Sequence, residues 1–517
     1  MNRYTKYITI IFSLTLYFCL WKWMNPLLGY NLDSDCVAYL TIAERVAHGD
    51  YFKSINGLWS PLNSWILALF IKNGFDAWST AKCLNALFGA IILIQSFFLF
   101  LKFKINKHLV IYLQTVLSIV MVYFVYFQMF GDVLQIMLVL CYLWILWHKD
   151  SHPLSYKQAV FSGLIMGIAF YAKAYSFFFF ALHFLATLAW HSNQLDLKWK
   201  KGLSLYGVGL LTAIVVMMPW SWMLHKKYNE WSLNGHAGKL NMSWYINSGK
   251  SFNTNIGLLI PPSYDDSPSF WEDPYLSQSN LSTPFTSATH FIKWIFRIVH
   301  TTIIMIFCFQ EISFLGLSLL LFGLFYFFFR KEKNEKVIEN FQMQCLLITI
   351  IILPLGYLMM HIETRYIWLA VILLMILGAY LIDKLTNIYA NKYIQHALYG
   401  ILAISFLVFP LYQFENLKDK NKDLFEFADV LNKNHIKGKF TSNMSDAGRM
   451  WVVAYLTKSN FYTIEQSGFS QEALLNEMKK YQVRYYFFES ENNTSTLQME
   501  GMKSIFKYNN IEILELL

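Results

Sequence analysis

Residues 109–127 read LVIYLQTVLSIVMVYFVYF, an apolar run that contains no Asp, Glu, Lys or Arg. A helix of about 20 such residues spans the hydrocarbon core of a bilayer. The whole chain agrees with a membrane location, because 15% of its 517 residues are charged, against about 25% in soluble domains. Its mean hydropathy is +0.36. These features predict a polytopic, mainly α-helical membrane protein.

Other apolar runs of similar length are expected to cross the bilayer as well, which gives eleven spans in total. Residues 61–73 are too short for a span, and residues 291–309 carry Lys293 and Arg297. Both segments are therefore predicted to lie along the outer surface. If both crossed instead, the chain would have thirteen spans. The other ten expected spans lie near residues 7–24, 81–101, 132–147, 159–172, 174–190, 203–224, 312–329, 342–360, 366–382 and 395–413.

The short loops between the spans alternate in charge, which predicts their orientation. Cytoplasmic loops are enriched in Lys and Arg. The loops rich in these residues are 102–108, 148–158, 191–202, 330–341 and 383–394. The short loops on the opposite side hold only Lys173 and Arg365. We therefore place the N-terminus in the cytoplasm. The net charge of +9 reports this topology rather than affinity for nucleic acid.

Three regions face outward in this topology: loop 25–80, loop 225–290, and the tail 414–517, which follows the membrane module 1–413. Loop 225–290 is rich in Pro, Asn and Ser, and is expected to be irregular. The tail alternates amphipathic and apolar segments, which predicts a small α/β domain. Its expected helices are 423–434, 446–457 and 470–481, and its expected strands are 438–442, 460–464, 483–488 and 511–516.

Acidic residues occur at the outer ends of the first and fourth spans. Asp33 and Asp35 follow the first span, and either could simply cap a helix that begins near Cys36. Asp132 follows Gly131 in a very short outer turn, where capping is again the simplest interpretation. Carboxylates at such positions usually face the bundle or a water-filled cavity. Acids from the two sites could therefore share a metal ion, a sugar hydroxyl or the proton of an acceptor.

Two basic residues lie on the outer side, where the charge pattern disfavours them. Lys173 lies between two spans, and could either extend its ammonium group to lipid headgroups or contact a phosphate. Arg365 lies in His361-Ile-Glu363-Thr-Arg365-Tyr366. Its planar guanidinium suits a pair of phosphate oxygens, although an ion pair with Glu363 would also explain it. The six cysteines show neither metal-ligand spacing nor a disulfide framework.

The order of these residues resembles that of a known family. Asp35-x3-Tyr39-x3-Ala43, Gly49-Asp50 and Pro61-Leu62 resemble the first outer loop of lipid-dependent GT-C glycosyltransferases. This family includes the protein O-mannosyltransferases and the lipid A aminoarabinose transferases. The resemblance covers most of residues 1–385, and continues through Asp132, Lys173, Pro219-Trp220 and Glu363-x-Arg365-Tyr366.

The resemblance implies a bacterial enzyme of the cytoplasmic membrane with a GT-C-like helical bundle. It would transfer a sugar, with inversion, from a polyprenyl-phosphate donor to an acceptor hydroxyl at the outer face. Asp35 would be the general base, Asp132 would orient the acceptor, and Asp33 could serve as a second acid. Lys173 and Arg365 would bind the donor phosphate. The remaining expected substrate-binding residues are Tyr39, Glu363 and Tyr366.

The chain departs from the family pattern at two positions and leaves other functions open. Cys36 stands where many members have Glu, and Ser60 stands where the aminoarabinose transferases have Lys. The acceptor could be a glycolipid, a polysaccharide or a protein, and a divalent cation is neither required nor ruled out. A transporter or flippase is disfavoured because the charged residues gather at the outer ends of the spans. A ligase or polymerase would rely on His236, and a non-catalytic binding protein would tolerate replacement of Asp35.

Overall fold

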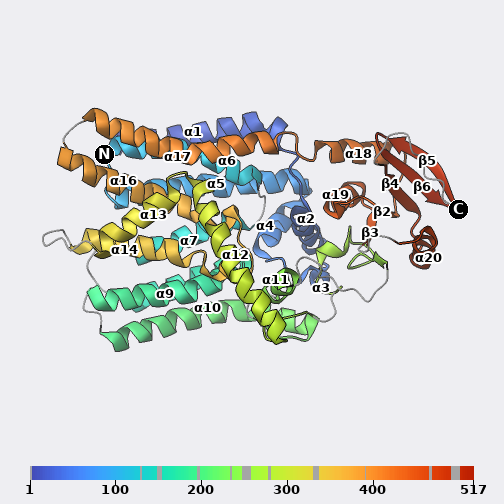
Figure 1. Ribbon diagram of the computed structural model, residues 1–517, viewed down its shortest axis with the longest axis horizontal. Helices are drawn as coiled ribbons and strands as arrows, with labels where there is room; N and C mark the ends of the chain where they lie inside the picture. The colour runs from blue at the N-terminus through green and yellow to red at the C-terminus, as the bar shows by residue number, and fades with distance from the viewer. Residues whose placement is uncertain are drawn as a thin grey trace.

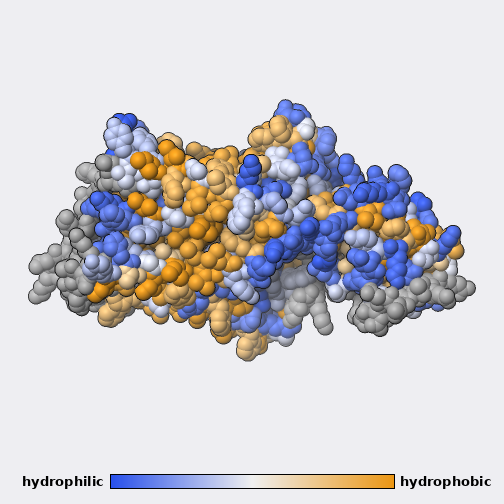
Figure 2. Space-filling model, turned by 90° about the horizontal axis from the view of Figure 1, so that it is seen from above, coloured by the Kyte–Doolittle hydropathy of each residue, from blue (hydrophilic) through white to orange (hydrophobic). Residues whose placement is uncertain are grey.

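A computed structural model describes residues 3–127, 131–147, 154–194, 198–232, 236–246, 258–277, 281–329, 337–389, 392–464, 469–490 and 501–517. The molecule is elongated, with a bundle of long helices at one end and a small domain that contains the sheet at the other (Figure 1). Figure 2 shows hydrophobic residues concentrated over the bundle and hydrophilic residues over the small domain. This division separates a surface suited to lipid from a surface suited to water.

Helices of the bundle lie at all eleven predicted spans. Six segments of the described chain are individually long and apolar enough to cross a membrane: α1, α5, α6, α10, α12 and Tyr393–Lys433, which includes α17 except its first residue. The protein is therefore a multi-pass membrane protein. The helices are α1 (Arg3–Leu28), α5 (Ala77–Lys102), α6 (Lys107–Phe127), α7 (Asp132–Leu146), α8 (Tyr156–Ala172), α9 (Tyr175–Gln194), α10 (Trp199–Tyr228), α12 (Ala288–Ile312), α13 (Gly316–Leu324) with the π-helical turn η2 (Phe325–Phe329), α14 (Val337–Ile352), α15 (Leu355–Leu358), α16 (Leu369–Tyr389) and α17 (Lys392–Leu417).

The two doubtful segments differ in length. Residues 61–73 form α4 (Leu62–Ile71), whose ten residues rise only about 15 Å and fall short of the hydrocarbon thickness. Residues 291–309 lie within α12, which meets the length and hydropathy of a span. In Figure 1, α12 runs obliquely across the bundle. A surface location for α12 therefore remains a prediction.

Glycine allows two helices of the bundle to pack closely. A Cβ atom at Gly163 of α8 would lie 2.2 Å from the carbonyl oxygen of Gly209 of α10. One at Gly167 would lie 2.7 Å from Cβ of Val216. Small residues at such contacts let transmembrane helices approach and gain van der Waals contact. The α8–α10 pair thereby fixes the segment that leads into Lys173.

Short elements lie between the bundle and the C-terminal domain (Figure 1). Those labelled there are α2 (Ser34–Ala47), α3 (Tyr51–Ser54), α4 and α11 (Ala237–Ile246). The chain also forms two short 3-10 helices, η1 (Phe270–Glu272) and η3 (Thr364–Ile367). Asp33 sets the start of α2, because its Oδ1 accepts a hydrogen bond of 2.7 Å from the backbone N–H of Cys36. Loop 225–290 contains α11 and η1, and is therefore less irregular than predicted. Its residues 233–235, 247–257 and 278–280 lie outside the described part.

The C-terminal domain contains the predicted α/β elements and one further strand, β5. Its sheet has the order β1-β3-β2-β4-β6-β5. Strand β2 runs parallel to β3 and β4, and the other pairs are antiparallel. Edge strand β1 (Leu259–Ile260) comes from loop 225–290. The other elements are α18 (Lys422–Lys433), β2 (Lys439–Ser442), α19 (Ala447–Thr457), β3 (Asn460–Ile464), α20 (Gln471–Tyr481), β4 (Tyr485–Glu489), β5 (Met502–Tyr508) and β6 (Ile511–Leu516).

Candidate active site

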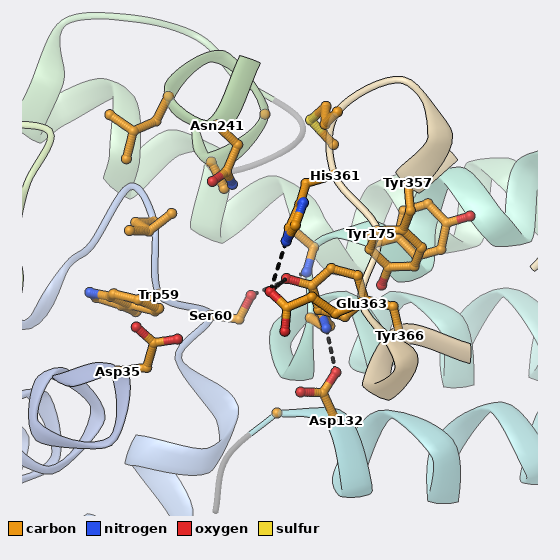
Figure 3. A pocket seen from close by; sticks show the side chains of 18 of the residues that line it. Asp35, Trp59, Ser60, Asp132, Tyr175, Asn241, Tyr357, His361, Glu363 and Tyr366 are labelled. Atoms are coloured by element: carbon orange, nitrogen blue, oxygen red, sulfur yellow. Dashed lines mark hydrogen bonds and ion pairs between the residues drawn. The ribbon is translucent and has the colours of Figure 1, made fainter. Parts of the chain in front are cut away.

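A cavity of about 420 Å³ lies where the short elements next to the C-terminal domain meet the ends of the bundle helices. Figure 3 shows acidic, aromatic and imidazole side chains around it. Seven of the eight residues predicted from the sequence line this cavity: Asp35, Tyr39, Asp132, Lys173, Glu363, Arg365 and Tyr366. They come from α2, the start of α7, the α8–α9 turn, and the segment around η3. The eighth residue, Asp33, caps α2 and does not belong to the cavity lining.

Asp35 occupies the first turn of α2, and its side chain is 26% exposed. Its Oδ1 accepts a hydrogen bond of 3.2 Å from the indole Nε1 of Trp271, and its Oδ2 lies 3.8 Å from Nη2 of Arg365. Burial and the neighbouring charge of Asp33 raise the pKa of Asp35 from 3.8 to about 6, against the opposing effects of Arg365 and Trp271. A carboxylate with such a pKa is ionised at neutral pH, yet is a stronger base than an ordinary Asp.

Asp132 and Lys173 form an ion pair across the cavity wall. Asp132 opens α7 after Gly131, whose φ of +78° explains the glycine at that turn. Nζ of Lys173 also lies 4.0 Å from the ring centroid of Tyr366, within cation–π range. Burial lowers the pKa of Lys173, and the charge of Asp132 opposes this effect. A lysine thus reaches the cavity with an acidic partner that favours its charged form.

Arg365 is held by Glu363, as the simplest interpretation of the sequence anticipated, and both residues line the cavity. Nε of Arg365 lies 2.7 Å from Oε2 of Glu363. Oε1 of the same carboxylate lies 3.1 Å from Nε2 of His361 and accepts a hydrogen bond of 3.3 Å from the Tyr366 hydroxyl. Although burial acts in the opposite direction, His361 and Arg365 lower the pKa of Glu363 to about 2. Glu363 is therefore a fixed anion, and Asp35 is better suited to accept a proton.

Seventeen cavity residues were not predicted as site residues, and seven of them are Phe, Tyr or Trp. Trp271 of η1 touches Asp35, and its carbonyl oxygen accepts a hydrogen bond of 3.1 Å from Nε1 of Trp59. Tyr245 of α11 stacks on His361 with ring centroids 4.6 Å apart. These residues lie in segments without regular hydropathy periodicity. The aromatic and acidic run Phe-Trp-Glu-Asp at 270–273, in an otherwise Pro- and Ser-rich loop, was the available signal.

Within the described residues, no group of three or more His, Cys, Asp or Glu side chains is arranged to hold a metal ion. Asp35 and Asp132 each have other partners, namely Trp271 and Lys173. The cavity brings one carboxylate of raised pKa, Asp35, together with two cations, Lys173 and Arg365. His236, which a ligase or polymerase would use, packs against the rings of Tyr228 and Tyr275, and is not part of the cavity lining.

The similarity of this chain to known proteins lies in its fold. No family model and no curated protein sequence matches the chain. Among solved structures, ArnT from Cupriavidus metallidurans bound to undecaprenyl phosphate is similar with a TM-score of 0.53 and 11% identity, over 98% of this chain and 97% of that one. The apo state of the same protein gives 0.53 and 10% over the same shares. The Archaeoglobus fulgidus oligosaccharyltransferase, in complex with Zn and sulfate, gives 0.51 and 12%, over 93% and 68%. The chain thus has a GT-C-like fold, as the resemblance implied.

Proposed function

We propose that the protein is a glycosyltransferase that moves a sugar, with inversion, from a polyprenyl-phosphate donor to an acceptor hydroxyl. The observation that carries this proposal is the convergence of one basic carboxylate, Asp35, with two cations, Lys173 and Arg365, on a single cavity. A carboxylate of raised pKa can accept the proton of a hydroxyl. Two cations can stabilise the charge that develops on a leaving phosphate.

The fold supports the same function. ArnT, whose structure contains undecaprenyl phosphate, has this fold along almost its entire length. A lipid-linked donor also suits a cavity at the ends of membrane helices, because its tail can remain in the bilayer while its phosphate reaches the cavity. Loops rich in Lys and Arg at the opposite ends of the helices favour an N-terminus in the cytoplasm. The cavity and the C-terminal domain would then face the outer side of a bacterial cytoplasmic membrane.

In the proposed reaction the acceptor oxygen attacks the anomeric carbon while Asp35 takes its proton. The bond from the anomeric carbon to the phosphate oxygen breaks, and polyprenyl phosphate leaves with the electron pair. A single displacement of this kind inverts the anomeric configuration. Lys173 and Arg365 bind the leaving phosphate, and their partners Asp132 and Glu363 keep them charged and in position.

Tyr39 and Tyr366 contribute the shape of the cavity rather than a charge. Tyr39 lies against Trp59, with ring centroids 5.4 Å apart, on the side of Asp35. Tyr366 lies under the ammonium group of Lys173. We infer that these rings contact the transferred sugar and the acceptor. The acceptor that presents the hydroxyl is a glycolipid, a polysaccharide or a protein.

The test is transfer of labelled sugar from polyprenyl-phosphate donors in membranes that contain the wild type, Asp35→Asn or Asp132→Asn. Both substitutions are nearly isosteric, so protein levels should remain comparable and can be checked by immunoblot. We expect Asp35→Asn to abolish transfer and Asp132→Asn to reduce it.

Asp76→Asn is the matched control, because Asp76 caps α5 in the same outer loop and Asn is an equally good cap. It should transfer as the wild type does. Normal transfer by Asp35→Asn would overturn the assignment of the base, and parallel measurement of Asp33→Asn would show whether the other acid serves instead. Absence of transfer by the wild type from every donor would overturn the proposed function.

A further inference from the structure

The indole of Trp271 lies between the candidate base and the C-terminal domain. Its Nε1 donates to Oδ1 of Asp35 at 3.2 Å. Its ring stacks on Trp451 of α19, with centroids 5.2 Å apart and an interplanar angle of 21°. Trp59 meets its edge at 5.8 Å. Only the side chain of Trp271 therefore separates Trp451 of the C-terminal domain from the carboxylate of Asp35, the proposed base.

The backbone around Trp271 is also attached to the C-terminal domain. Strand β1 pairs with β3, with Leu259 opposite Ile464 and Ile260 opposite Thr463. The carbonyl oxygen of Pro268 accepts a hydrogen bond of 2.8 Å from the backbone N–H of Phe461. Segment 258–277 is thus part of the sheet of one domain while its tryptophan lines the cavity of the other.

Two buried ion pairs anchor the same segment to the membrane module. Nη2 of Arg45, on α2, lies 3.1 Å from Oε2 of Glu272. Nζ of Lys227, at the end of α10, lies 2.6 Å from Oδ2 of Asp273. All four side chains are at most 6% exposed. Because removing one partner of a buried pair leaves an uncompensated charge, these pairs fix the position of η1 strongly.

Few charged groups compete with Trp271 for Asp35. Asp33, Glu363 and Arg365 act on it through their charges. Two other buried or half-buried acids on and beside α2 have partners of their own. Glu272 of η1 is paired with Arg45, and Glu44 of α2 accepts a hydrogen bond of 2.7 Å from Tyr455 of α19.

We infer that the C-terminal α/β domain is a positioning element of the site: through Trp451 it holds Trp271 so that the indole N–H fixes the carboxylate of Asp35. This inference rests on the proposed function. With Oδ1 engaged by the indole, Oδ2 is the oxygen that receives the proton of the acceptor. Trp271 touches the reacting carboxylate, and Trp451 acts through Trp271 as a positioning residue.

The first test compares pH profiles of kcat/KM for the full-length wild type, Trp271→Phe, Trp451→Ala and Trp451→Phe. The hydrogen bond from Trp271 lowers the pKa of Asp35, so its loss should move the acid limb upward by about 0.5–1 pH unit. We expect this shift in Trp271→Phe, together with a fall of about 2- to 5-fold in kcat/KM at pH 6, because a smaller fraction of Asp35 is then ionised. Trp451→Ala should show the same direction, and Trp451→Phe, which keeps an aromatic face, should recover about half or more of the wild-type activity.

Met478→Ala is the control for general damage to the domain, because Met478 of α20 is fully buried in a different hydrophobic cluster. It should lower stability without moving the acid limb. A Trp451→Ala profile that coincides with that of the wild type, or a shift of equal size in Met478→Ala, would overturn the inference.

A second readout does not depend on activity. Carbodiimide labelling of Asp35 in the purified full-length protein, followed by mass spectrometry as a function of pH, reports the protonation midpoint of its carboxyl group. The midpoint should rise in Trp271→Phe and Trp451→Ala, and remain unchanged in Met478→Ala. If wild-type transfer is normal but the midpoints coincide in all variants, the inference fails and the proposed function stands. If no donor supports transfer while the midpoints separate, the proposed function fails and the positioning contact stands.

Discussion

Replacement of Asp35 by Asn should abolish transfer and yet stabilise the protein. Burial raises the pKa of Asp35 from 3.8 to about 6, so the folded state binds the proton more tightly than the unfolded state. Stability from this proton is fully present below pH 3.8 and is lost as the pH rises through 6. A difference of about 2 pKa units corresponds to about 3 kcal/mol. Since the side chain is 26% exposed, solvent screening reduces this cost to about 1–2 kcal/mol.

Asn resembles the protonated carboxyl group in size and carries no charge, so Asp35→Asn should recover this free energy at pH 7–8. The unfolding entropy of about 2.1 cal/mol/K per residue converts 1–2 kcal/mol into a rise of about 1–2 °C in Tm for a chain of this length. The rise should shrink as the pH falls toward 5. Wild-type transfer should fall over the same interval, by about tenfold for each pH unit below 6, because the protonated acid is no longer a base.

The measurement is thermal unfolding in detergent at pH 5, 6, 7 and 8, paired with transfer at each pH. Asp76→Asn provides the control, because Asp76 caps a helix outside the cavity and its replacement should leave the pH dependence of Tm unchanged. A Tm difference between Asp35→Asn and the wild type that does not depend on pH would refute the link to protonation. Transfer that stays constant between pH 5 and 8 would refute the assignment of Asp35 as the titrating base.

Four substitutions test the ion pairs of the site and the anchor of η1. Lys173→Gln and Asp132→Asn should each raise the KM for the donor, and the double variant should lose less than the two losses combined, since the residues form one ion pair; steady-state kinetics of the three variants check this. Arg365→Lys should lower kcat/KM by about 10-fold or more, because an ammonium cannot replace the planar fork that holds Glu363; donor titration measures it. Arg45→Met should cost about 3–5 kcal/mol by leaving Glu272 buried without its cation, and a loss below about 1 kcal/mol in denaturant unfolding would contradict this.

The membrane module could be predicted from the sequence because its signals are local. Apolar length gave the spans and also separated 61–73 from a full span, which the ten-residue helix α4 confirms. The fold of the tail could also be predicted, since amphipathic helices alternate with short apolar strands there. Strand β5 was missed because its residues, MKSIFKY, are mostly exposed and form no clear apolar face. Strand β1 could not be predicted, because it consists of two residues whose partner lies about 200 positions away.

The site could be predicted from the sequence only in part, for the same reason. Asp132, Lys173 and Arg365 stood out because they are among the few charged residues in the short loops that were predicted to face outward. Trp271 gave no such signal, since its role follows from contacts with Asp35 and with Trp451, which lie far away in the sequence on either side of it. Tertiary contacts of this kind leave no periodicity in the chain.

For Arg365 and Lys173, an ion pair within the protein is compatible with a role in the cavity. An ion pair between Arg365 and Glu363 was the alternative to phosphate binding, yet the pair itself faces the cavity. Burying a cation is costly unless an anion compensates its charge. A guanidinium has five N–H donors, and Glu363 and Asp35 lie against only its Nε and Nη2 nitrogens in the described contacts. The ion pair therefore offsets the cost of burying the charge of Arg365, and it leaves other N–H donors of the guanidinium without a contact to either acid. The same argument applies to Lys173, whose partner Asp132 supplies the compensating charge.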